Sequence, residues 1–146
     1  MIYLICGFPG AGKTEFCKKI THCKVVDLDH FIENETGKTI QELIQNLGED
    51  EFRNLELDFL RGHFLSDNTV VSLGGGSLSD SLIKEIEGSS NLTCFWLATD
   101  FETCWKRIEH DKSRPITAGM SKAQANHLYN ERSKKYSLFE KIVFTN

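Results

Sequence analysis

Residues 7–14 read Gly-Phe-Pro-Gly-Ala-Gly-Lys-Thr, a glycine-rich loop that ends in a lysine and a hydroxyl side chain. The spacing G-x-x-x-x-G-K-[ST] is typical of loops whose backbone N–H groups surround the phosphates of a nucleotide. In such a loop Lys13 can reach the β- and γ-phosphates, and the hydroxyl of Thr14 can bind Mg²⁺. The residues that would bind the nucleotide here are Gly10, Ala11, Gly12, Lys13 and Thr14.

The neighbours of this loop favour the same interpretation. An apolar run at 1–6 predicts a buried strand before it, and a helix is expected to begin at Lys13. The start of a helix adds positive potential, which suits a polyphosphate. A strand-to-helix turn that is glycine-rich by chance is the alternative. The motif does not identify the group that receives the phosphate.

Composition narrows the class of protein. The chain has 146 residues, 40% of them hydrophobic and 26% charged, which predicts one globular domain over 1–146. Its net charge of −4 argues against a broad nucleic-acid surface. We expect no membrane segment, because no apolar stretch approaches about 20 residues, and no signal peptide, because a basic leader is missing. The five cysteines lack C-x-x-C spacing, so they are expected to be reduced core thiols of a cytoplasmic protein.

Alternating patterns predict an α/β fold. Apolar runs of strand length recur at 2–6, 24–28, 69–73, 91–98 and 142–145. The segments between them have helical periodicity, and this alternation is typical of a three-layer sandwich with a parallel sheet.

Helix starts are marked by Ser or Thr followed three residues later by Glu or Gln, which predicts capping boxes at Thr39, Thr99 and Ser121. Helices at about 39–47 and 50–65 would separate the second and third strands, and we expect this module, about 30–65, to hold a second substrate. Residues 109–121 have little core pattern and are expected to form a surface loop that is long enough to act as a lid.

Two acids follow the second predicted strand. Asp27 and Asp29 are two residues apart, so on a strand their carboxylates would share a face at the edge where ligands bind. Asp27 could help to hold Mg²⁺ through water, and Asp29 could accept a proton from an attacking hydroxyl. The alternative is that a polar strand end caps the next helix.

Further residues could recognise an acceptor. Arg53 and Glu56 are three apart on a helix, which fits either an exposed ion pair or an arginine oriented to hold a carboxylate. Gly74-Gly75-Gly76 fits either a flexible turn or a close approach of backbone to ligand. The cations Arg107, Arg114 and Arg132 have equally ordinary explanations as solvated surface residues.

Taken together, these motifs resemble the shikimate kinase family of P-loop kinases, in order and over nearly the whole chain. The matching segments are G-x-x-G-x-G-K-T at 7–14, D-x-D at 27–29, G-E-x-x-F-R-x-x-E at 48–56, G-G-G at 74–76, R-P at 114–115 and R-x-x-x-Y at 132–136. The resemblance implies a five-stranded parallel sheet of order 2-3-1-4-5. It also implies transfer of the γ-phosphate of ATP, with Mg²⁺, to the 3-hydroxyl of shikimate by an enzyme of aromatic amino acid biosynthesis. We expect this enzyme to be a monomer.

The resemblance also assigns roles to the residues. Lys13, Thr14 and Asp27 would serve the phosphates and Mg²⁺, Arg107 would face the adenine, and Arg114 would close onto the transferring phosphoryl group. Shikimate would be bound by Asp29, Arg53, Glu56, Gly74, Gly75, Gly76 and Arg132. Asp29 would be the base, and Glu56 would orient Arg53.

The sequence departs from the family pattern at three places. The third strand ends Ser72-Leu73-Gly74 without an Asp, the lid has Thr117 where an apolar residue is usual, and the chain stops soon after its last strand. The last departure leads us to expect a partly exposed sheet face. Two other functions remain open at this point: a gluconate- or nucleoside-type kinase, and a catalytically weakened nucleotide-binding protein.

Overall fold

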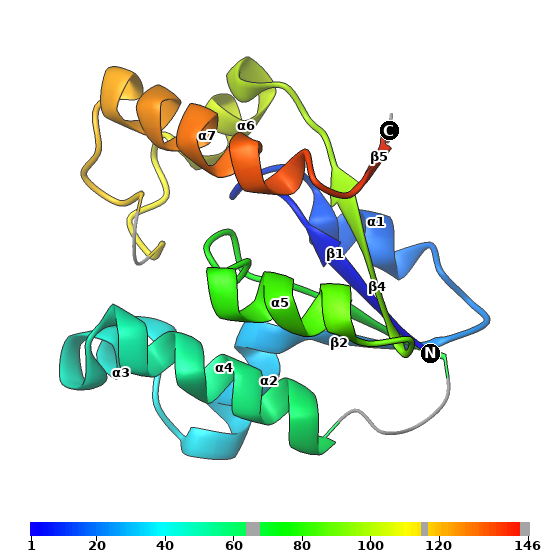
Figure 1. The fold of residues 1–146 in the computed structure, drawn as a ribbon. Coiled ribbons are helices and arrows are strands. Elements are labelled where there is room, and N and C mark those ends of the chain that lie inside the picture. Colours follow the sequence, from blue (N-terminus) through cyan, green and yellow to red (C-terminus); the bar gives the residue numbers. More distant parts are fainter. Residues whose placement is uncertain (64–67, 115–116, 144–146) are drawn as a thin grey trace.

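The structure is a computed structural model, and it describes residues 1–63, 68–114 and 117–143. Its centre is a sheet of five parallel strands in the order β2-β3-β1-β4-β5, as predicted (Figure 1). The strands are β1 (Ile2–Cys6), β2 (Lys24–Asp27), β3 (Thr69–Ser72), β4 (Leu92–Leu97) and β5 (Glu140–Ile142).

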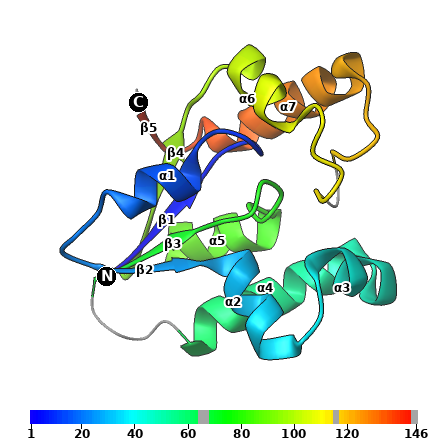
Figure 2. The same ribbon diagram turned by 180° about the vertical axis from the view of Figure 1, so that it is seen from behind.

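Helices cover both faces of this sheet, which confirms the predicted α/β sandwich. They are α1 (Lys13–Lys18), α2 (Leu28–Thr36), α3 (Ile40–Leu47), α4 (Glu49–His63), α5 (Asp80–Gly88), α6 (Phe101–Ile108) and α7 (Lys122–Tyr136). Helix α1 lies on one face and α5 on the opposite face (Figures 1 and 2). Helices α2, α3 and α4 form a module beside the β2 side of the sheet, and the α6–α7 loop faces α3 (Figure 1).

Two groups of buried side chains show how the strands divide the core. Leu4 of β1 and Val71 of β3 belong to a large cluster. Their neighbours in sequence, Ile5 and Val70, belong to a smaller cluster that includes Cys17 of α1. This alternation follows from the two-residue period of a strand. Strands that are buried on both faces also explain the nearly continuous apolar runs in the sequence.

The second strand is shorter than predicted. It ends at Asp27, and α2 begins at Leu28, so Asp29 lies in the first turn of a helix rather than on a strand. The prediction that Asp27 and Asp29 share a strand face is therefore wrong. Asp27 is the N-cap of α2, and its carboxylate accepts a hydrogen bond from the N–H of His30 at 3.2 Å. A capping carboxylate satisfies a helix N–H group and favours an early helix start.

Of the three predicted capping boxes, one is confirmed in full and one in part. Ser121 forms the complete capping box with Gln124, and the Thr39 hydroxyl accepts from the N–H of Glu42. The box predicted at Thr99 is wrong, because Asp100 caps α6 instead. The Thr99 hydroxyl donates to the carbonyl of Ala11 at 2.6 Å and so ties this turn to the glycine-rich loop.

Other boundaries differ by a few residues. Helix α4 spans Glu49–His63 where 50–65 was predicted, and residues 64 and 65 lie outside the described residues. Strand β5 spans Glu140–Ile142 where 142–145 was predicted, and 144 and 145 also lie outside them. Within the described ranges, no helix combines the length and apolar character needed to cross a membrane. All five cysteine thiols are free, and four are buried: Cys6, Cys17, Cys94 and Cys104.

Candidate active site

The carboxyl ends of β1, β2 and β3 bring the predicted site residues together. The glycine-rich loop follows β1, Asp29 follows β2 and Gly74–Gly76 follow β3. In parallel sheets this edge is where ligands bind, because the loops leave a crevice there. Several cavities adjoin the edge, and two of them divide the predicted residues into two sets.

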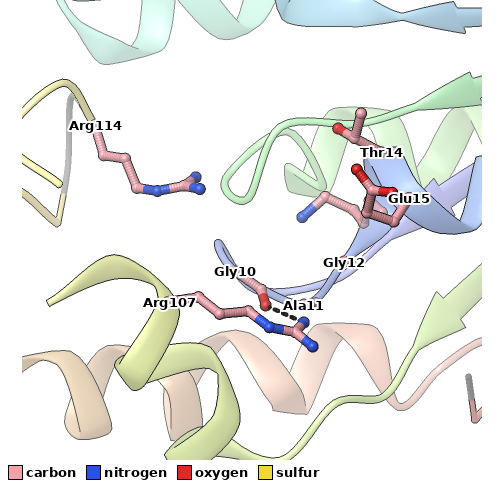
Figure 3. A pocket seen from close by; sticks show the side chains of 8 residues that line it. Gly10, Ala11, Gly12, Thr14, Glu15, Arg107 and Arg114 are labelled. Carbon is pink, nitrogen blue, oxygen red and sulfur yellow. Dashed lines mark hydrogen bonds between the residues drawn. The ribbon is translucent and has the colours of Figure 1, made fainter. Parts of the chain in front are cut away.

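The first cavity has a volume of about 300 Å³ and is formed around the glycine-rich loop. It is lined by Gly10, Ala11, Gly12, Lys13, Thr14, Glu15, Arg107 and Arg114. All residues predicted to bind the nucleotide are in this set, which Figure 3 shows from close by.

The backbone of this loop requires glycine at position 10. Gly10 has a φ of 84°, in the left-handed region, and a Cβ there would stand 2.7 Å from the carbonyl oxygen of Cys104. The guanidinium of Arg107 donates to the carbonyl of Gly10 at 2.8 Å (Figure 3). Its predicted contact with adenine stays a prediction, and in this structure Arg107 holds the loop.

Backbone carbonyls of the glycine-rich loop hold the side chain of Lys13 in place. Its Nζ donates to the carbonyls of Gly7 at 2.6 Å and Phe8 at 3.2 Å. Burial lowers the pKa of Lys13 to about 8, and the charge of Arg114 acts in the same direction. A desolvated ammonium without an acidic hydrogen-bond partner gains most when an anion arrives, so this arrangement suits a phosphate.

The second cavity is smaller, about 70 Å³, and lies between the glycine-rich loop, α3, α4 and α7. Its lining contains every predicted acceptor-binding residue except Glu56: Asp29, Arg53, Gly74, Gly75, Gly76 and Arg132. It also contains Pro9, Ile40, Ile44, Phe52, Arg114 and Thr117.

Glu56 lies behind this lining and fixes Arg53. Arg53 Nη1 is 2.6 Å from Glu56 Oε1, and Glu56 is only 2% exposed. The same carboxylate accepts a hydrogen bond from the hydroxyl of Ser77. Burial alone would lower the pKa of Arg53, but Glu56 and Glu49 outweigh it and raise the pKa. The interpretation as an exposed ion pair is therefore wrong, and a charged guanidinium is held in one orientation.

Arg132 reaches the same place from α7, and no described residue gives it a carboxylate partner. Its Nη1 is buried and has no hydrogen-bond partner in the described part of the chain. Burial lowers the pKa of Arg132, and the nearby charge of Arg53 adds to the effect. A Cβ on Gly76 would be 2.5 Å from Nη2 of Arg53 and 2.8 Å from Nη2 of Arg132. The two guanidiniums thus converge on one bare backbone position and can hold an anion between them.

The triple glycine is required by packing rather than by flexibility. A Cβ on Gly75 would stand 2.4 Å from Cδ of Pro9, which is part of a rigid ring, and the Gly75 carbonyl accepts from the hydroxyl of Tyr136. We predict that Gly75→Ala lowers the free energy of unfolding by about 1–3 kcal/mol through overpacking. Thermal denaturation measures this. Gly62→Ala is the matched control, since a Cβ there meets nothing within 4 Å; an equally stable Gly75→Ala would contradict the packing explanation.

Asp29 is the acid of the second cavity. Burial raises its pKa to about 6, and the neighbouring carboxylates of Glu56 and Asp27 add to the shift. Its carboxylate oxygens lie 2.9 Å from the place where a Cβ on Gly74 would stand. Although the predicted strand geometry is wrong, the first turn of α2 still points this carboxylate into the cavity, where a proton could be accepted near neutral pH.

Arg114 connects the two cavities, since among the described residues it lines both. It extends from the α6–α7 segment toward the glycine-rich loop (Figure 3). Its Nε is 3.2 Å from Oδ2 of Asp111, and Oδ1 of the same carboxylate accepts from the N–H of Ser113. A cation at this boundary can neutralise charge on a group that passes from one cavity to the other.

The predicted Mg²⁺ residues offer hard oxygen donors. Thr14 lines the first cavity, and Asp27 presents an exposed carboxylate at the start of α2. The described residues contain no cluster of three or more His, Cys, Asp or Glu side chains that could hold a metal by themselves. Because Mg²⁺ keeps several waters and substrate phosphates as ligands, a hydroxyl and one carboxylate fit its requirements.

Sequence reasoning missed six lining residues: Pro9, Glu15, Ile40, Ile44, Phe52 and Thr117. Ile40, Ile44 and Phe52 follow the apolar periodicity of α3 and α4, so the sequence pattern marks them only as core. Pro9 and Glu15 are adjacent in sequence to predicted site residues, and this position was the one feature from which they could have been predicted. The sequence showed Thr117 only as an unusual lid residue.

Comparisons with known proteins agree with this geometry. The family model described as shikimate kinase matches residues 9–146. A shikimate kinase of Persephonella marina is 35% identical, with 93% of this chain and 83% of the relative covered, and one of Staphylococcus epidermidis is 31% identical, with 92% and 79% covered. The solved structure of Acinetobacter baumannii shikimate kinase in complex with shikimate superposes with a TM-score of 0.81 at 25% identity, covering 99% of this chain and 83% of that one.

Proposed function

Because the chain belongs to the shikimate kinase family, we propose that it transfers the γ-phosphate of ATP to the 3-hydroxyl of shikimate and yields shikimate 3-phosphate and ADP. The observation that carries this proposal is the convergence of Arg53 and Arg132 on Gly76, beside the acid Asp29. A hydroxylated carboxylate matches these groups in both charge and hydrogen-bonding chemistry.

The nucleotide occupies the first cavity in this proposal. The N–H groups of Gly10, Ala11 and Gly12 and the ammonium of Lys13 bind its phosphates, and Arg107 lies on the adenine side. Thr14, and Asp27 through water, would hold Mg²⁺, which would neutralise charge on the phosphates. The fit rests on the oxygen donors of these two side chains and on their position beside the loop.

The acceptor occupies the second cavity. Its carboxylate lies between Arg53 and Arg132, and Glu56 keeps Arg53 in place. Its ring lies against the backbone of Gly74, Gly75 and Gly76, where the absence of side chains allows close approach. This placement brings the 3-hydroxyl toward Asp29 and toward the first cavity.

Transfer then needs positioning and charge neutralisation more than covalent help. The 3-hydroxyl oxygen attacks the γ-phosphorus, the bond to the β–γ bridging oxygen breaks, and ADP leaves with that electron pair. The hydroxyl proton passes to the carboxylate of Asp29. Arg114 stabilises the transferring group, and closure of residues 109–121 as a lid would exclude water that could otherwise hydrolyse ATP.

We also propose that the protein is a cytoplasmic monomer of aromatic amino acid biosynthesis that binds neither nucleic acid nor membranes. The net charge of −4 gives no general attraction to nucleic acid. Five free thiols suit a reducing compartment.

Arg132→Met tests the acceptor site with little risk to the fold. Arg132 contacts the Phe8 ring and Tyr136, but burial and the nearby charge of Arg53 disfavour its guanidinium, so its loss should change the melting temperature little. The KM for shikimate should rise roughly 10- to 100-fold, since a charge-assisted hydrogen bond contributes about 1.5–3 kcal/mol. The KM for ATP should stay constant.

Steady-state kinetics with each substrate varied in turn measures this difference. Arg61→Met is the matched control, because Arg61 is an exposed arginine on α4 that pairs with Glu85. Arg53→Met is a poorer test, since it leaves the buried carboxylate of Glu56 unpaired and destabilises the fold. Shikimate kinetics that are indifferent to Arg132→Met would refute the assignment of the second cavity.

A further inference from the structure

The side chain of Thr117 is buried, yet its hydroxyl lacks a hydrogen-bond partner. Thr117 is 5% exposed, and its Oγ1 finds no partner among the residues that the structure describes. The backbone around it is held in place: its carbonyl accepts from the N–H of Met120 at 3.1 Å, and the N–H of Ala118 donates to the carbonyl of Arg114 at 3.3 Å. A buried hydroxyl of this kind costs free energy until something supplies a partner.

The residues around Thr117 indicate which molecule could form a hydrogen bond with its hydroxyl. Thr117 lines the second cavity, whose apolar walls include Ile40, Ile44 and Phe52. These three side chains have no polar atoms and cannot satisfy a hydroxyl. A molecule in the cavity can do so, because it would lie against the same lining as Thr117.

We propose that Thr117 determines acceptor specificity by hydrogen bonding to a ring hydroxyl of the bound acceptor. This inference rests on the proposed function, in which the carboxylate lies at Arg53 and Arg132 and the 3-hydroxyl lies at Asp29. The 4- and 5-hydroxyls of shikimate then remain, and Thr117 binds one of them.

Thr117→Val removes the hydroxyl and keeps the shape of the side chain. We expect the KM for shikimate to rise about tenfold, the loss of one hydrogen bond, with kcat and the KM for ATP nearly unchanged. Thr117→Ser keeps a hydroxyl and should restore the KM. Thr93→Val is the matched control, because Thr93 lies on β4 and lines neither cavity. The melting temperature of Thr117→Val should not fall, since the lost hydroxyl has no partner among the residues that the structure describes.

Shikimate analogues without the 4- or the 5-hydroxyl provide the decisive comparison. For one of the two, the wild-type protein should lose about tenfold in kcat/KM, while Thr117→Val loses nothing further. An unchanged KM in Thr117→Val, or a Thr117→Ser variant that is as poor as Thr117→Val, would overturn the assignment while the wild-type protein still phosphorylates shikimate. A wild-type protein inactive with shikimate would overturn the proposed function and this inference together.

Discussion

Replacing Arg114 with alanine is expected to lower kcat for shikimate phosphorylation by about three powers of ten, as for arginines that act on a transferring phosphoryl group. Arg114 lines both cavities and extends toward the glycine-rich loop, so its charge lies where phosphoryl transfer would occur. The charge on the phosphoryl oxygens is redistributed only during transfer. The KM for ATP should therefore change far less than kcat.

Two further variants separate this role from a general effect of charge. Lys112→Ala removes an exposed cation from the same segment, and Lys112 lines neither cavity, so it should leave kcat unchanged. Arg114→Lys keeps the charge but not the fork of N–H donors, and only part of the rate should return. If Arg114→Ala kept a kcat close to that of Lys112→Ala, Arg114 would have no part in transfer.

Asp29→Asn should have opposite effects on activity and on stability. As the proposed base, Asp29 contributes about 10²- to 10⁴-fold to the rate, so kcat should fall by at least about a hundredfold. The KM for ATP should be nearly constant, because Asp29 does not line the first cavity. Single-turnover kinetics at saturating ATP would measure the lost step directly, and an unchanged rate would remove Asp29 as the base.

The stability effect follows from the raised pKa of Asp29. Its pKa rises from an ordinary 3.8 to about 6 in the folded protein, so folding favours the protonated carboxyl. Relative stability is lost as the pH rises from about 4 to 6, and above pH 6 the ionised group costs roughly 3 kcal/mol. Asn cannot ionise, so Asp29→Asn should raise the melting temperature at pH 7.5, with a gain that disappears below about pH 4.

Melting curves between pH 4 and 8 test this relation. Asp58→Asn is the control, because Asp58 is an exposed carboxylate on α4 and its loss should shift stability by less than about 0.5 kcal/mol. A melting temperature of Asp29→Asn below that of the wild-type protein at pH 7.5 would show that the carboxylate stabilises the fold. The kcat/KM for shikimate should also fall as the pH drops below about 6, as the base becomes protonated.

The sequence predicted the nucleotide side of the site most fully. Lys13 and its loop form a local motif, in which consecutive residues meet the same ligand, and the strand before them set its place in the sheet. The acceptor side depends on distant segments. Arg132 of α7 and Arg53 of α4 lie close together beside Gly76 because of how the fold packs. In the sequence, only the family resemblance indicated that these two arginines act together.

Burial explains most of what the sequence left open. The spacing of Arg53 and Glu56 could not show whether the pair is exposed or buried, because residues three apart are neighbours on a helix in either case. Asp29 was predicted as an acid of the site from a strand pattern that is wrong, since Asp27 caps a helix that begins at Leu28. Thr117 lies in a segment without periodicity, where no pattern could show that its hydroxyl has no partner among the described residues.

A coupled assay of ADP release tests the central claim most directly, with shikimate, quinate, gluconate and nucleosides offered in parallel and one sample left without acceptor. The two adjacent cavities, one for phosphates and one with two arginines for a carboxylate, predict rapid ADP release with shikimate, none with nucleosides, and only slow release without an acceptor. Shikimate 3-phosphate should accumulate in equal amount to ADP. Turnover with gluconate or a nucleoside but not with shikimate, or no turnover with any acceptor, would contradict the account.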